Sequence, residues 1–106
     1  MGTKTIFEVE SMDMRVQESD PPHVQVKASG TTRTGGWTNP RLAPVIHKMA
    51  PKDGILELTF VADEPGGAST DAITPIESEE LDLGLVPKGT KGVRVIAETN
   101  KIEELF

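Results

Sequence analysis

Apolar and polar residues alternate along most of the chain, and this period of two predicts β-strands. Residues 5–10 and 12–17 both alternate, but the apolar residues hold odd positions in the first segment (Phe7 and Val9) and even positions in the second. A shift of one residue turns every later side chain to the other face of the sheet. We therefore expect a β-bulge near Ser11, or a strand that leaves one sheet and joins another.

Further segments alternate in the same way, with turn residues between them, at residues 23–32, 41–49, 55–62, 80–86 and 93–97. Pro44 interrupts one of them, which predicts an edge strand or a bulge because proline donates no ladder hydrogen bond. Asp53-Gly54 is a strong hairpin signal. Residues 100–106 fit either a strand or one helical turn.

About seven strands at this spacing predict a single all-β domain over residues 1–106, an antiparallel β-sandwich of the immunoglobulin-like kind. The alternative is a small closed β-barrel. No segment has the apolar period of an amphipathic helix of three turns. The expected centre of the core consists of Leu56, Leu58, Phe60, Leu81, Leu83, Val93 and Val95.

Composition narrows the classes of function. The chain has 106 residues, no cysteine and a net charge of −6, which argues against thiol chemistry, disulfides and nucleic-acid binding. No apolar run is long enough to cross a membrane, and residues 1–7 lack the apolar region of a signal peptide. We therefore expect no membrane partner, and either a cytoplasmic protein or a mature secreted one.

The most distinctive segment is residues 34–41, which contain Gly36, Trp37, Asn39 and Arg41. Glycine lets the backbone present a neighbouring aromatic ring, and tryptophan and arginine are enriched at binding hot spots. These four residues are the candidate binding site, for a protein or a carbohydrate. The alternative is that Trp37, one of only four aromatic residues, fills the core. The long loop at residues 63–74 is expected at the same end of the molecule.

Signals for catalysis and metal binding are weak. His23 and His47 are the only histidines, too few for a zinc site, and no serine lies in a Gly-x-Ser-x-Gly motif. We predict no cofactor, no metal ion and no catalytic residue. The preferred function is a non-enzymatic binding module. The alternative is a structural homo-oligomer that assembles through strand edges, and a small hydrolase, which would need a histidine beside a carboxylate or hydroxyl, is the least favoured.

Overall fold

The structure is a computed structural model that describes residues 2–18, 23–45, 53–66, 72–86 and 89–106. These residues form strands and connecting segments, and none of them forms a helix that could cross a membrane. The strands are β1 (Thr3–Thr5), β2 (Glu8–Gln17), β3 (His23–Thr32), β4 (Thr38–Pro44), β5 (Ile55–Asp63), β6 (Thr74–Glu77), β7 (Leu81–Leu85), β8 (Gly92–Ile96) and β9 (Lys101–Leu105).

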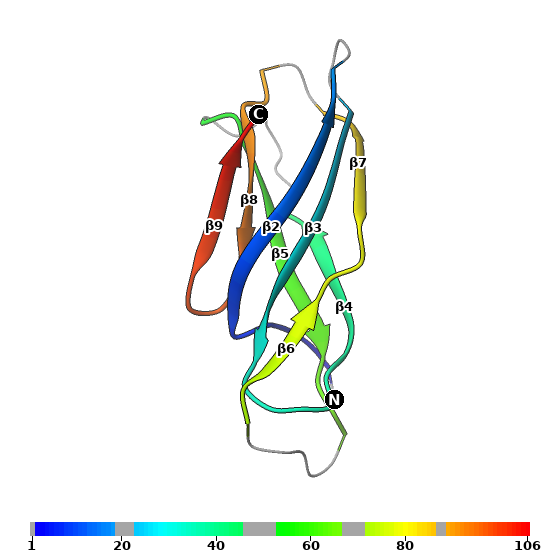
Figure 1. Ribbon diagram of the computed structural model, residues 1–106, viewed down its shortest axis with the longest axis vertical. Coiled ribbons are helices and arrows are strands. Elements are labelled where there is room, and N and C mark those ends of the chain that lie inside the picture. Colours follow the sequence, from blue (N-terminus) through cyan, green and yellow to red (C-terminus); the bar gives the residue numbers. More distant parts are fainter. Residues whose placement is uncertain (1, 19–22, 46–52, 67–71, 87–88) are drawn as a thin grey trace.

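Two sheets pack face to face in an elongated domain of 48 × 25 × 19 Å (Figure 1). Sheet A contains β1, β4, β5, β8 and β9, and sheet B contains β2, β3, β6 and β7. The predicted all-β sandwich is confirmed, and the strands of the described ranges form no closed barrel. Two of the strands beyond the expected seven, β1 and β6, have only three and four residues.

One strand pair departs from the antiparallel arrangement. β8 pairs with β5 in parallel, from Ile55 opposite Gly92 to Thr59 opposite Ile96. β7 lies in sheet B and β8 in sheet A, so the chain crosses between sheets before β8. Apolar alternation reports which face of a strand is buried and carries no information on the direction of its neighbour.

The shift of phase near Ser11 has the expected structural cause. Val9 lies opposite Gly30 and Ser11 opposite Ser29, so Glu10 is the extra residue of a bulge. The chain also changes sheet just before this bulge, because Ile6 N donates to Phe60 O in sheet A while Phe7 N donates to Thr31 O in sheet B.

Alternation places Phe7 on the same face as Val9, and this crossing overturns that prediction. Ile6 is the side chain that enters the core beside Val9, at 0% exposure, whereas Phe7 is only half-buried. Gly30 makes room for Ile6, because a Cβ at that position would lie 2.8 Å from Ile6 Cδ1.

Other boundaries differ slightly from expectation. β4 begins at Thr38, inside the expected loop, and β9 shows that the last segment is a strand. β4 and β5 pair antiparallel, as the hairpin signal at Asp53-Gly54 predicts, while residues 46–52 lie outside the described residues.

The core lies between the two sheets. Of the residues expected at its centre, Leu58, Phe60, Val93 and Val95 are at most 1% exposed. Leu56, Leu81 and Leu83 are only partly buried and pack against the core from its margin. Other core residues, outside that expected set, are Ile6, Val9, Met12, Val24, Val26, Ala28, Leu42, Ala62, Val86 and Ala97.

A cluster of charged residues lies on the outer face of sheet A. Arg94 of β8 has Glu57 of β5 on one side and Glu103 of β9 on the other, each in direct cross-strand register. The guanidinium donates to Glu57 at 3.1 Å, to Glu103 at 2.7 Å and to Asp53 at 3.3 Å. This Arg94 cluster joins three neighbouring segments of the sheet.

Candidate binding site

The segment that connects β3 to β4 holds Trp37 against the end of β5. Gly36 has a φ of 85°, a left-handed conformation that favours glycine. A Cβ at Gly36 would lie 3.1 Å from Pro65 Cβ, so the segment packs closely on the residues that follow β5. The expectation that these two loops share one end of the molecule is confirmed for residues 63–66, and residues 67–71 lie outside the described ranges.

Trp37 combines both interpretations of its role. Its ring is half-buried and packs against the core, and it also lines a pocket. The indole Nε1 donates to Thr34 Oγ1 at 2.9 Å, which fixes the ring relative to its own loop.

Asn39 and Arg41 belong to a separate cluster of hydrogen bonds that links three strands of sheet A. Asn39 has a φ of 53°, and the register of β4 on β5 shifts between Thr38 and Arg41. Arg41 donates to Asp63 Oδ1 at 3.2 Å and to Thr3 Oγ1 at 2.9 Å, so it links β4, β5 and β1. The Thr3 hydroxyl and then the Arg41 guanidinium lower the pKa of Asp63.

The segments that line the pocket are β1 and the residues that follow β1, β3, β5 and β8, and they meet at the lower end of the sandwich in Figure 1. It has a volume of about 370 Å³ and combines apolar and charged walls. Segments far apart in the sequence contribute its lining residues, which are Lys4, Thr5, Phe7, Arg33, Thr34, Trp37, Glu64, Pro65 and Glu98.

The charged residues of the pocket pair with one another. Lys4 Nζ lies 2.7 Å from Glu64 Oε1, and Arg33 forms an ion pair with Glu98. The hydrogen bond between Lys4 and Glu64 raises the pKa of the lysine and lowers that of the carboxyl. Two cations therefore balance two anions, and the pocket has no net charge.

The apolar part of the pocket consists of Trp37, Phe7 and Pro65. The Arg33 guanidinium lies over the Phe7 ring, 4.4 Å from its centroid, which is a cation–π geometry. This contact covers one ring, while Trp37 offers an aromatic surface on the neighbouring wall.

The turn between β8 and β9 holds one wall of the pocket in place. Glu98 N donates to Ile6 O, and both Thr99 N and its hydroxyl donate to Phe7 O. The Asn100 side chain accepts from Val9 N and donates to Val9 O, each at 2.8 Å. These bonds replace ladder pairing at the start of β2 and fix Glu98 opposite Arg33.

Sequence reasoning found Trp37 and the glycine beside it but missed most of the pocket. Lys4, Phe7, Arg33, Glu64 and Glu98 come from four separate segments, and nothing in their local sequence marks them. Only the pairing of distant strands brings them together.

A histidine beside a carboxylate, which a hydrolase would need, is present away from the pocket. His23 Nε2 lies 2.6 Å from Asp82 Oδ1 on the outer face of sheet B, where Asp82 also accepts from Gly84 N. Neither residue lines the pocket, and His47 lies outside the described part of the chain. The described residues include no group of three or more metal-ligating side chains.

Comparisons with known proteins add no identity: no family model, no curated protein and no solved structure matches this chain.

Proposed function

We propose that this domain is a non-enzymatic binding module whose pocket accepts a small uncharged carbohydrate. The observation that carries this proposal is the composition of the pocket, in which the Trp37 ring lies beside the Arg33–Glu98 and Lys4–Glu64 ion pairs. Its volume of about 370 Å³ is at the low end of the range for small-molecule sites.

The balance of charges favours an uncharged ligand. An anion would meet Glu64 and Glu98 as well as Lys4 and Arg33, and a cation would meet the same mixture. The carboxylates accept hydrogen bonds from hydroxyl groups, and the ammonium and guanidinium groups donate to them. Charged groups also form hydrogen bonds stronger than those of neutral ones. A ligand rich in hydroxyl groups therefore suits the polar walls.

The aromatic wall of the pocket suits the apolar part of a sugar. A sugar ring has an apolar face of C–H groups as well as its hydroxyl groups, and that face can lie on the Trp37 ring. The bond from Trp37 Nε1 to Thr34 holds the ring in one orientation before binding, which lowers the entropy lost when the ligand is ordered.

A glycan array probed with the labelled domain tests the proposal broadly, and titration calorimetry with the sugars that bind follows. We expect saturable binding of neutral glycans that weakens at least about tenfold in Trp37→Ala. Arg33→Ala is the second variant, because Arg33 is exposed and its loss is not expected to unfold the domain. Lys27→Ala, on an exposed face of β3, is the matched control.

Two results would overturn this function. One is an array on which no neutral glycan binds above background. The other is binding that Lys27→Ala and Trp37→Ala reduce equally while both variants stay folded by circular dichroism.

A further inference from the structure

β2 is a terminal strand of sheet B and pairs with β3 on one side. At its start, the Asn100 side chain occupies the open side by bonding to both backbone groups of Val9. Beyond the bulge, residues 11–16 pair with β3, and in the described ranges no strand pairs with their other edge. An open strand edge can pair with a strand of another chain.

The direction of the backbone groups on this edge follows from β3. Ala28, which lies opposite Met12, directs its N–H and C=O away from β2, because they bond to Ser78. In an antiparallel ladder such residue pairs alternate with pairs that bond each other. Met12, Met14 and Val16 therefore direct their backbone groups to the open edge.

The side chains of this edge match those of the same edge in a second copy. If two copies pair antiparallel about Met14, then Met14 lies opposite Met14 of the second copy and Met12 lies opposite its Val16. On the outer face, Asp13 lies opposite Arg15 of the second copy, twice by symmetry. Asp13 and Arg15 form no ion pair with any other residue that the structure describes. Opposite charges in such cross-strand positions stabilise a sheet.

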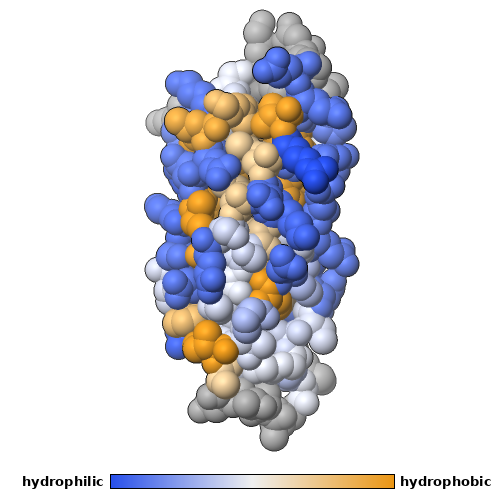
Figure 2. Space-filling view, in the orientation of Figure 1, coloured by the Kyte–Doolittle hydropathy of each residue, from blue (hydrophilic) through white to orange (hydrophobic). Residues whose placement is uncertain are grey.

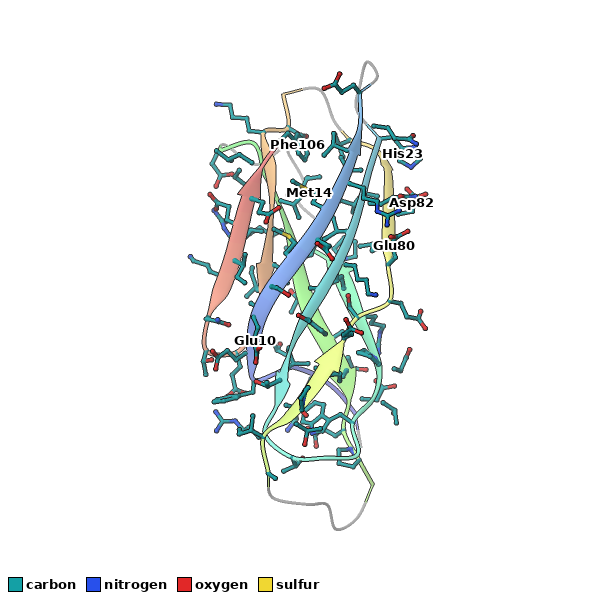
Figure 3. The ribbon with its side chains drawn as sticks, in the orientation of Figure 1. Glu10, Met14, His23, Glu80, Asp82 and Phe106 are labelled. Carbon is teal, nitrogen blue, oxygen red and sulfur yellow. The ribbon has the colours of Figure 1, made fainter. Side chains whose placement is uncertain are left out.

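Apolar side chains flank the same edge. Val16 is 36% exposed, and at the same end of the sandwich Leu105 and Phe106 are 65% and 43% exposed. Figure 3 shows Met14 and Phe106 in the same half of the molecule, with Phe106 nearer its end, and Figure 2 shows apolar residues at that end of the face. A second copy at this edge would cover part of this apolar surface.

β9, an edge strand of sheet A, lacks this complementarity. Pairing of β9 with itself about its central residue would bring Glu103 opposite Glu103 and Glu104 opposite Ile102. Like charges directly opposite each other destabilise a sheet, so β2 is better suited than β9 to pair with a second copy.

We propose that this chain forms a two-fold symmetric dimer by antiparallel pairing of its β2 edges, with Met14 at the axis and Asp13 paired with Arg15 of the second copy. The two four-stranded sheets become one continuous sheet. The pockets at the Trp37 end stay open, and the dimer stands whether or not the pocket binds carbohydrate.

Sedimentation equilibrium over a range of protein concentrations tests the dimer. We expect the mass to rise toward twice the 11.4 kDa of the chain. Arg15→Asp places Asp13 opposite an aspartate, and the dissociation constant should rise about tenfold. The double variant Asp13→Arg with Arg15→Asp restores opposite charges, and its constant should return to within about threefold of the wild type. Glu80→Lys, a reversal of charge at an exposed position between β6 and β7, which lie across β3 from β2, should leave the constant unchanged.

Met14→Pro tests the backbone geometry separately. Proline removes the N–H that points to the open edge and leaves the bonds between β2 and β3 in place, so the dimer should be lost while the β-sheet circular dichroism spectrum remains. A monomer at every concentration up to about 1 mM overturns the proposal. So does a dimer that Arg15→Asp weakens no more than Glu80→Lys, or one that a folded double variant does not recover.

Discussion

Arg94 lies on the outer face of sheet A and Arg33 lies at the pocket, and the two arginines have different surroundings. Arg94 is 19% exposed and contacts Glu57, Glu103 and Asp53. Arg33 is 58% exposed, contacts Glu98, and covers the Phe7 ring. Each combines a guanidinium with carboxylates, but the partners reach it by different routes.

Strand register sets the partners of Arg94. Glu57 and Glu103 lie directly across the ladder from it, so the backbone pairing that builds the sheet also forms the ion pairs. The partner of Arg33 comes instead from the turn after β8 and meets it at the rim of the pocket. A ligand that takes over the bonds of Arg33 would disturb no strand pair. The ion pairs of Arg94 are therefore tied to the strand pairing, whereas the pair of Arg33 and Glu98 can break without disturbing it.

Substitution of each arginine should separate these two roles, and this is the largest effect we expect. Arg94→Ala leaves three carboxylates close together without their cation and should lower the free energy of unfolding by about 2 kcal/mol. Arg33→Ala removes an exposed pair and should change it by less than about 1 kcal/mol. Urea denaturation followed by circular dichroism measures both. Equal losses in the two variants would remove the distinction.

Asn100→Ala should lower the free energy of unfolding by removing the two bonds that hold the turn after β8, which carries Glu98, against β2. Loss of the side chain leaves Val9 N–H and C=O without these partners, at a cost of about 1–2 kcal/mol in the free energy of unfolding. Asn100→Asp keeps an acceptor for Val9 N but sets a second carboxylate oxygen against Val9 O, so it should also lose stability at neutral pH. Thermal unfolding of the wild type and the two variants measures both losses. An Asn100→Ala variant as stable as the wild type would mean that these two bonds contribute little.

The sequence was sufficient for most of the strands, though not for β1 and β6, and insufficient for the site, for a physical reason. Alternation identified β3, β5 and β8 because each buries one face, and the phase shift at Ser11 located the bulge. Phe7 was misplaced because the chain crosses between the sheets there, and alternation does not hold through such a crossing.

The candidate site was predicted only where local chemistry marks it. Trp37 and Gly36 stand out beside one another, and Trp37 lines the pocket. Asn39 and Arg41 lie on the same segment, but Asn39 donates to Asp63 and Arg41 donates to Thr3, outside the pocket. Membership of one loop therefore did not mean membership of one site. The glutamates and cations of the pocket depend on contacts across up to 65 residues of sequence, which no local pattern reports.

Acid pH should reveal a smaller contribution from the carboxylates of both regions. The pKa of Asp53 is lowered first by the hydrogen bond from Ile55 N and further by Arg94. At the pocket, the pKa of Glu64 is lowered first by the hydrogen bond from Lys4. A carboxyl whose pKa is lower in the folded state binds fewer protons there than in the unfolded state. Its stabilising effect is therefore complete above the unfolded pKa of about 4 and is lost as the pH falls through the folded pKa.

The free energy of unfolding should consequently decline below about pH 4, and urea denaturation at a series of pH values measures the decline. Asp53→Asn should make it shallower, while Glu80→Gln, at an exposed position outside both clusters, serves as the matched control. The hydrogen bond from Ile55 N–H lowers the pKa of Asp53 the most. Asp53→Asn should therefore make the decline shallower by nearly as much in a protein that also carries Arg94→Ala. If Asp53→Asn has no effect in the Arg94→Ala protein, Arg94 rather than the Ile55 N–H is the main cause of the lowered pKa of Asp53. The ion pair between Asp53 and Arg94 would then be stronger than its 3.3 Å distance indicates.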